Sequence, residues 1–169
     1  MRWVMHWKIS KDCYDSKSLI YQLGSILPDW FMRHPIHCYN KTKEKFEKRL
    51  YKTKQMKPGF RKNWNAGVLA HYIEDYCCTA HSDENYFHLY NHRVFEVQEQ
   101  KFFKKFSTIK KFNIESKETI IETIESTLQS LQQDIKNFNS NEWYTDTKIM
   151  ELDIYYSYAL VKTVLQWIG

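Results

Sequence analysis

Hydrophobic residues recur at helical spacing most clearly between Arg61 and Thr79. An α-helix turns once every 3.6 residues, so apolar positions three and four residues apart lie on one face. This stretch therefore predicts a helix from residue 61 to about residue 79. The apolar positions that set the pattern are Trp64, Val68, Leu69, Tyr72, Ile73 and Tyr76.

Short polar or turn-forming segments divide the remainder of the chain into further predicted helices. Lys57-Pro58-Gly59 is the clearest break, and loops are also expected at residues 106–115 and 137–141. Ser82 or Asp83 is suited to cap one helix, and Ser116 is the expected cap of another. The other expected helices span residues 16–26, ending near Pro28-Asp29, then 42–53, 83–105, 116–135 and 147–167. The pattern indicates five or six helices in one bundle.

The composition favours the same all-α fold. Only 4 Gly and 3 Pro occur in 169 residues, too few turn formers for a sandwich or barrel of many short strands. Hydrophobic residues make up 43% of the chain, which argues against disorder. The length is that of one ordinary domain with one core. We therefore expect an all-α, single-domain multi-helix bundle that covers residues 1–169.

The net charge of +5 comes largely from two lysine-rich stretches, residues 41–57 and 101–111. Such stretches are usually solvated helix faces and loops. The alternative is attraction to an anionic partner, either a phospholipid headgroup or nucleic acid. Charge alone does not choose between these interpretations.

The cysteines and the apolar segments indicate where the protein resides. Cys13, Cys38, Cys77 and Cys78 show no C-x-x-C spacing, so free thiols are expected. The first residues lack the apolar core of a signal peptide, and no stretch of about 18 apolar residues could span a membrane. We expect a cytoplasmic protein, or a secreted one if a signal preceded residue 1.

Histidine and acidic residues supply the candidate chemistry. His71 and Asp75 are four residues apart on the strongest predicted helix, and His92 and Glu96 repeat that spacing on the next one. Residues four apart lie about one turn along the same helix face, so each pair can bind one cation. His81 falls between the two pairs. Imidazole and carboxylate are ligands that Zn²⁺ selects, and bundles bind metals with such pairs from facing helices.

A single His/acid pair at this spacing is more often a surface ion pair than a metal site. The combination of two pairs with an intervening histidine is much less common by chance, although such patterns carry a false-positive risk. Metal binding is therefore the favoured interpretation of the set as a whole.

These residues carry a resemblance to a known family. The run from Gly67 to Asp75 reads G-x-x-x-H-Y-x-x-D, with a histidine six residues later and then His92-x-x-x-Glu96. This resembles the core signature of the zinc-dependent phospholipase C family, which is related in fold to the zinc-dependent single-strand nucleases. Gly24 to Asp29 resembles the family's G-x-x-x-P-D element. The similarity covers residues 5–96, and no motif is recognised beyond it.

The resemblance implies a set of ligands for two or three Zn²⁺ ions. In this family the first ion is bound by the aspartate of the G-x-x-x-P-D element and by the histidine and aspartate of the H-Y-x-x-D motif. The site of the second ion has one coordination position open for water. The third ion is bound by an N-terminal histidine. His37 is the expected partner of Asp29, with His34 as the alternative. The implied ligands are Asp29, His37, His71 and Asp75 for the first ion, His81, His92 and Glu96 for the second, and His6 with a bridging Asp75 for the third.

The implied chemistry is hydrolysis of a phosphodiester by metal-activated water, with Asp29 as the residue that orients or deprotonates the water. The expected substrate is a phospholipid or another phosphodiester, with peripheral membrane contact possible and nucleic acid less favoured. Glu74 is expected to be a solvated helix residue, with contact to a metal ligand as the alternative. Two other functions stay open: a single-strand nuclease, and an inactive metal-stabilised binding or structural protein.

Overall fold

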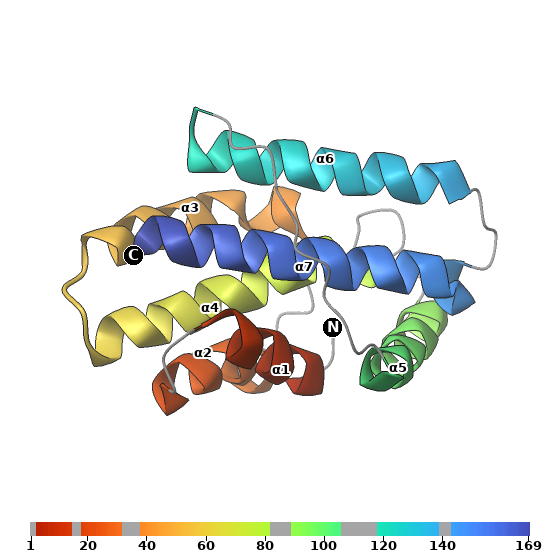
Figure 1. Ribbon diagram of the computed structural model, residues 1–169, viewed down its shortest axis with the longest axis horizontal. Helices are drawn as coiled ribbons and strands as arrows, with labels where there is room; N and C mark the ends of the chain where they lie inside the picture. Colours follow the sequence, from red (N-terminus) through yellow and green to blue (C-terminus); the bar gives the residue numbers. More distant parts are fainter. Residues whose placement is uncertain (1–2, 15–17, 32–37, 82–88, 106–117, 139–142) are drawn as a thin grey trace.

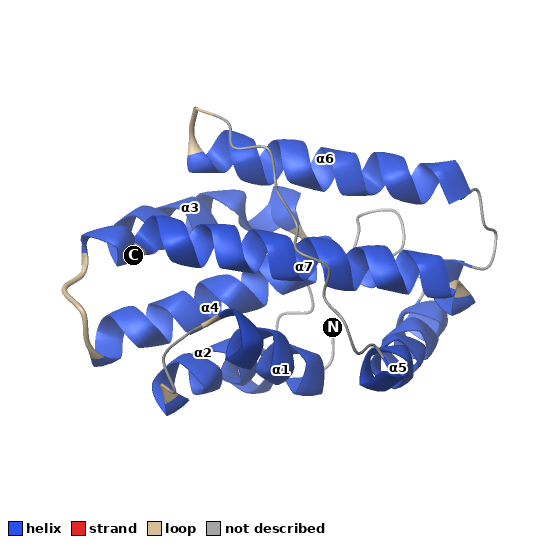
Figure 2. Cartoon of the chain, in the orientation of Figure 1, coloured by secondary structure: helices blue, strands red, loops and turns tan. Residues whose placement is uncertain are grey.

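The computed structural model describes residues 3–14, 18–31, 38–81, 89–105, 118–138 and 143–169. Within these ranges the chain forms helices and no strand (Figure 2). The α-helices are α1 (Trp3–Cys13), α2 (Leu19–Phe31), α3 (Tyr39–Gln55), α4 (Phe60–Cys77), α5 (Leu89–Lys105), α6 (Ile120–Phe138) and α7 (Thr147–Ile168). Short 3-10 turns, η1 (Thr79–His81) and η2 (Trp143–Thr145), precede α5 and α7. The all-α prediction is confirmed.

The bundle is built around α4 and α7. Helix α7 runs along the middle of the molecule with α6 on one side and α1 and α4 on the other, and α3 lies beside α4 (Figure 1). Helix α5 contacts η1 and α7 near one end. The core between these helices contains fully buried apolar side chains from most of them, including Met5, Phe46, Leu69, Ile73, Phe95, Ile124 and Ile154.

Helices α2 and α4 pack closely against each other, and each has a glycine at the contact. A Cβ atom on Gly67 would lie 2.1 Å from the carbonyl oxygen of Tyr21. A Cβ atom on Gly24 would lie 2.5 Å from the carbonyl oxygen of Trp64. Small residues let two helix backbones approach each other closely, and here that approach brings α2 against the middle of α4.

Gly67→Ala is expected to destabilise the protein despite the better helix propensity of alanine. The added methyl group would push against backbone atoms, which cannot move away as a side chain can, and overpacking of this kind costs about 1–3 kcal/mol. Denaturant unfolding at fixed zinc concentration measures the loss. Ser130→Ala, at an exposed position of α6, is the control and should be at least as stable as the wild type. Equal stability of Gly67→Ala would contradict the close contact.

Two sequence predictions about helices were wrong. Helix α1 was not predicted, and of the four side chains that it buries only Met5 and Ile9 are apolar, the others being His6 and Ser10. Helix α2 does not end at Pro28 but continues to Phe31. Proline there removes only one hydrogen bond, to the carbonyl of Gly24, and it lies in the last turn of the helix.

The predicted helix starts and breaks had mixed outcomes. Gly59 has φ of 147° immediately before α4, which confirms the break before that helix. Ser82, Asp83, Ser116 and the loop at residues 106–115 lie outside the described residues.

At the start of α6, Thr119 Oγ1 accepts from the Glu122 backbone N–H (3.1 Å), and the Glu122 carboxylate accepts from the Thr119 N–H (3.0 Å). This reciprocal capping box begins the helix at Ile120.

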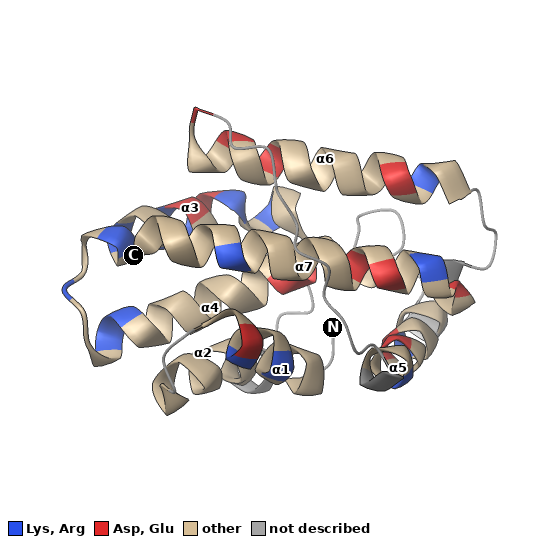
Figure 3. Ribbon diagram, in the orientation of Figure 1, with Lys and Arg blue, Asp and Glu red and all other residues tan. Residues whose placement is uncertain are grey.

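The basic residues of the first lysine-rich stretch lie along α3 (Figure 3). Lys41, Lys45, Lys48 and Lys52 are exposed, whereas Phe46 and Leu50 are buried on the opposite side of the helix. The stretch is thus a solvated helix face. Most of the second stretch lies outside the described residues. None of the described helices has both the length and the hydropathy needed to span a bilayer.

Candidate metal centre

The middle and later part of α4 is buried on every side, although it carries one histidine and two acidic residues. Every residue from Ala66 to Asp75 is buried. His71, Glu74 and Asp75 are each 0% exposed. Buried charges are costly unless they are paired or bind a metal, so this part of the helix requires polar partners from its neighbours.

The first of two side-chain groups, called the inner group here, consists of His6, His71 and Asp75. The Nε2 atom of His6, from α1, lies 3.5 Å from Asp75 Oδ1. The Nε2 atom of His71 lies 3.3 Å from Asp75 Oδ2. The two imidazole rings are adjacent, with centroids 4.3 Å apart. One carboxylate therefore faces imidazoles from two different helices.

The second set, called the outer group, consists of His81, His92 and Glu96. Glu96 Oε1 lies 3.4 Å from His92 Nε2, one turn earlier on α5, and 3.7 Å from His81 Nε2. The other ring nitrogen of His81, Nδ1, lies 3.3 Å from Asp75 Oδ1. His81 thus connects the two groups. The outer group is reached by solvent, because its side chains are 12%, 18% and 20% exposed in sequence order.

The distances within both groups fit a tetrahedrally coordinated cation. With zinc bonds of about 2.0–2.2 Å to nitrogen and oxygen, two ligand atoms of one ion lie about 3.4 Å apart. The nitrogen-to-carboxylate separations in the two groups run from 3.3 to 3.7 Å. A direct hydrogen bond is shorter, typically about 2.9 Å. The residues therefore fit Zn²⁺ in both donor type and spacing.

Two further contacts orient the histidines of the inner group. His6 Nδ1 lies 2.8 Å from Glu74 Oε2, and His71 Nδ1 lies 3.0 Å from the backbone carbonyl oxygen of Ser25. Each contact turns Nε2 toward Asp75, as partners of metal-binding histidines generally do. Glu74 is therefore a buried partner of His6, and the expectation that it is a solvated residue was wrong. Its role depends on α1, which was not predicted.

For His6 and Glu96, the electrostatics favour the protonation states that metal binding requires. Burial and the neighbouring His71 lower the pKa of His6 well below its ordinary value, so this imidazole is neutral. Burial would raise the pKa of Glu96, but His81 and His92 hold it well below its usual range. Burial would lower the pKa of His81, yet the carboxylates of Asp75 and Glu96 raise it. A dication beside these carboxylates would favour neutral His81 instead.

Three sequence-predicted residues lie outside what the structure describes. His34 and His37 belong to residues 32–37, and of Asp29 only the backbone, within α2, is described. The structure therefore brings together six of the predicted ligands, namely His6, His71, Asp75, His81, His92 and Glu96. Their binding of metal stays a prediction.

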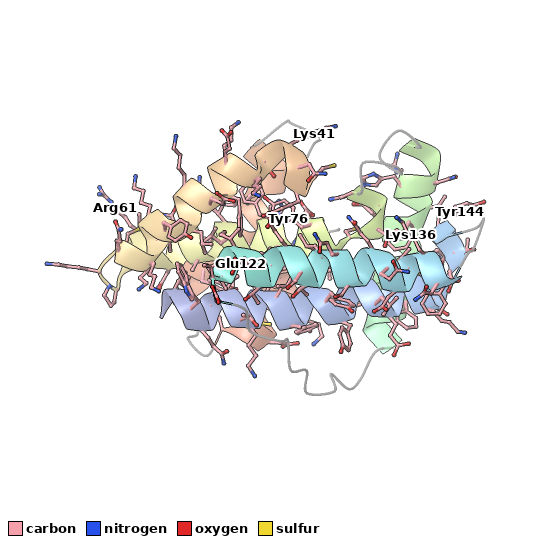
Figure 4. The ribbon with its side chains drawn as sticks, turned by 90° about the horizontal axis from the view of Figure 1, so that it is seen from above. Lys41, Arg61, Tyr76, Glu122, Lys136 and Tyr144 are labelled. Atoms are coloured by element: carbon pink, nitrogen blue, oxygen red, sulfur yellow. The ribbon has the colours of Figure 1, made fainter. Side chains whose placement is uncertain are left out.

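A cavity of about 480 Å³ adjoins the outer group, because His81 is one of its lining residues. It lies between α6 and the neighbouring ends of α3 and α4, with Tyr39 and Tyr76 on one side and Lys136 on the other. Figure 4 shows Tyr76 between α3 and α6, and Lys136 on α6. The cavity offers aromatic surface and charges of both signs, since Glu125 also lines it.

An all-helical bundle with paired His/carboxylate groups is the architecture of a helical metalloprotein with adjacent metal sites. A family model described as zinc dependent phospholipase C matches residues 5–157 of the 169-residue chain. The match covers most of the chain, and the protein belongs to this family. The match extends past Glu96, so it includes α6 and part of α7, where the sequence shows no recognised motif. Neither a curated protein nor a solved structure matches the chain.

Glu74→Gln is expected to weaken zinc binding by about 10- to 100-fold, the usual effect of removing a partner of a metal-binding histidine. Glutamine keeps the size of the side chain but removes the charge that orients His6. Competition with a chelating dye measures the affinity. Glu151→Gln, at an exposed position of α7, is the matched control and should leave the affinity unchanged. An unaltered affinity in Glu74→Gln would show that the His6 contact does not support metal binding.

Proposed function

We propose that the protein is a zinc-dependent hydrolase of phospholipids, which cleaves the phosphodiester on the glycerol side and releases a phosphorylated headgroup. The observation that carries the proposal is the position of Asp75, whose two oxygens lie 3.3–3.5 Å from His6, His71 and His81. One carboxylate thus joins the inner and outer groups. Membership of the zinc-dependent phospholipase C family supports the reaction class.

The two groups are suited to different roles. The inner group is wholly buried, which favours a cation that fixes the local structure. The outer group offers three protein ligands and is partly exposed. Three ligands with one open position is the pattern of catalytic zinc sites. Both groups have three described ligands, but only those of the outer group are partly exposed. We therefore place the substrate phosphate at the outer group. Zinc bound there would polarise the phosphoryl oxygens and lower the pKa of water.

Asp29 is the proposed residue for orienting or deprotonating the attacking water. Helices α2 and α4 run in the same direction where they pack together. Gly24 lies against Gly67, and the following residue of α2, Ser25, contacts His71, one turn further along α4. The backbone of α2 continues in the same direction for another turn, which contains residue 29. The next turn of α4 after His71 contains Asp75. The helix pair thus supports a position for Asp29 near the centre.

The cavity beside His81 is the proposed location of the headgroup. Its volume of about 480 Å³ is in the range of ordinary ligand sites. Aromatic faces such as that of Tyr76 attract cationic groups, whereas Glu125 and the ring of Tyr39 already face the ammonium group of Lys43. A zwitterionic headgroup such as phosphocholine therefore fits the chemistry of its walls.

The direct test is an assay of purified protein on phosphatidylcholine in mixed micelles, with zinc, with chelator, and with zinc restored. We expect phosphocholine release that stops on chelation and returns with zinc. Single-stranded DNA is the comparison substrate. Preferential degradation of DNA would identify a nuclease, and zinc binding without turnover of either substrate would identify an inactive metal-stabilised protein. Both results would contradict the proposal, as would phosphocholine release that chelator does not change.

Peripheral membrane contact through α1 is the accompanying proposal. This helix turns His6 into the core, while Trp3 and Trp7 are 53% and 40% exposed. Lys11 Nζ lies 5.3 Å from the ring centroid of Trp7. Exposed tryptophan next to lysine on a helix is typical of surfaces that lie in the membrane interface.

A Trp3→Ser, Trp7→Ser double variant should lose activity on vesicles while retaining activity on a soluble short-chain substrate. The reason is that the two rings contact the bilayer and not the phosphate. Vesicle sedimentation and parallel assays on both substrates measure the effect, with an exposed tyrosine variant, Tyr51→Ser, as control. Equal loss on both substrates would indicate damage to the metal centre instead of a membrane contact.

A further inference from the structure

A third group of potential ligands lies apart from the inner and outer groups. Cys78 follows α4, Glu99 is on α5 and Asp153 is on α7, and one ligand atom from each lies within 4.8 Å of the others. The three residues are almost wholly inaccessible, at 1%, 0% and 0% exposed. None of them belongs to the inner or outer group. They come from the end of α4, from the next α-helix and from the last one.

The two carboxyl groups differ in how they are satisfied. Asp153 accepts two hydrogen bonds from Thr79, one from the backbone N–H and one from the hydroxyl, each of 2.6 Å. Glu99 is fully buried, and neither of its oxygens has a hydrogen-bond partner. No Lys or Arg within the described parts of the chain forms an ion pair with either group. An unsatisfied buried carboxyl requires an explanation.

Proton sharing between the carboxyl groups does not supply that explanation. Burial is the main cause that raises the pKa of both Glu99 and Asp153. A shared proton would produce a direct O–H···O hydrogen bond between them, yet Glu99 makes none. The thiol of Cys78 and the carboxyl groups of Glu99 and Asp153 thus surround one point, and Glu99 makes no hydrogen bond to the other two. This is the arrangement expected around a cation.

We propose that Cys78, Glu99 and Asp153 bind a divalent cation that is separate from the ions of the inner and outer groups. The donor set indicates its identity, because thiolate ligands select zinc over magnesium or calcium. The hydrogen bonds from Thr79 hold the Asp153 carboxylate in place, as is usual for carboxylates that bind a metal. The ion would be structural. It would fix α5 against α7 and η1, and so position His81 relative to Glu96.

Cobalt substitution tests the proposal, because a thiolate bound to Co²⁺ gives an intense charge-transfer absorption in the near ultraviolet, whereas histidine and carboxylate ligands do not. The full chain is stripped of metal and titrated with Co²⁺. We expect the band in the wild type and in Cys77→Ser, and its loss in Cys78→Ser. Cys77 is an equally buried neighbour and therefore a matched control. A band that persists in Cys78→Ser, or no band in the wild type, would overturn the proposal.

A second variant keeps the test decisive if Cys78→Ser does not fold. Glu99→Gln preserves the size of the side chain and removes one ligand, so the protein should contain one zinc equivalent less than the wild type by elemental analysis. Glu151→Gln is the control. An unchanged zinc content in Glu99→Gln would refute the site. Phosphodiesterase activity is measured in a separate assay. The zinc content of Glu99→Gln therefore tests this site whether or not the proposed function is correct.

Discussion

Asp75→Asn is expected to remove zinc from the inner group and to weaken binding at the outer group. The carboxylate faces His6, His71 and His81, and asparagine keeps its shape but removes the charge that balances the cations. Loss of metal assistance is worth several kcal/mol in the transition state. On phosphatidylcholine we therefore expect kcat to fall by about a thousand-fold or more. Elemental analysis and the micelle assay measure the two effects.

Asp134→Asn is the matched control for this substitution. Asp134 is a partly exposed residue of α6, and its carboxylate accepts a hydrogen bond of 2.7 Å from Tyr156. The same chemical change there should leave both zinc content and activity as in the wild type. A full complement of zinc in Asp75→Asn, with the control behaving as expected, would show that Asp75 does not bridge the two groups.

Removal of zinc is expected to lower the melting temperature by about 15–30 °C. An ion present at about 1,000 times its dissociation constant stabilises a protein by about 4 kcal/mol, so the ions of the inner and outer groups alone contribute about 8 kcal/mol. For a chain of this length each kcal/mol shifts the melting temperature by about 2–4 °C. The physical cause is that His6, His71, Glu74 and Asp75 are buried together and lose the charge that compensates them.

Thermal unfolding followed by circular dichroism, with and without chelator, measures this shift. Restoring zinc should restore the melting temperature, whereas magnesium should not, because it prefers oxygen ligands to imidazole. A melting temperature that is the same with chelator and with zinc would mean that the buried histidines and carboxylates compensate one another without a cation.

Local periodicity predicted the helices that bury many large apolar side chains. The apolar positions of α4 and α7 recur every three to four residues, and both helices were predicted close to their observed ends. Helix α1 escaped prediction because the side chains it buries include His6 and Ser10. His6, the candidate ligand on α1, is thus also one of the polar residues that interrupt the apolar positions of this helix. Helix α4 was predicted although it buries His71, Glu74 and Asp75, because it also buries Val68, Leu69, Tyr72 and Ile73.

The same distinction separates the site residues that could be predicted from those that could not. His71 with Asp75, and His92 with Glu96, are each fixed by one helical turn, so the two pairs together with His81 predicted a metal site from the sequence. The contact of Glu74 with His6 requires α1 to pack against α4, and it has no local signal. Cys78, Glu99 and Asp153 come from three separate elements and meet only in the folded bundle.

Anomalous X-ray scattering at the zinc absorption edge tests the two-group centre most directly. A crystal of protein purified without chelator should show one zinc peak bonded to Nε2 of His71 and to Asp75, and a second bonded to Nε2 of His92 and to Glu96. The absence of a zinc peak at either place, with the side chains of His71 or His92 binding no metal, would contradict the account.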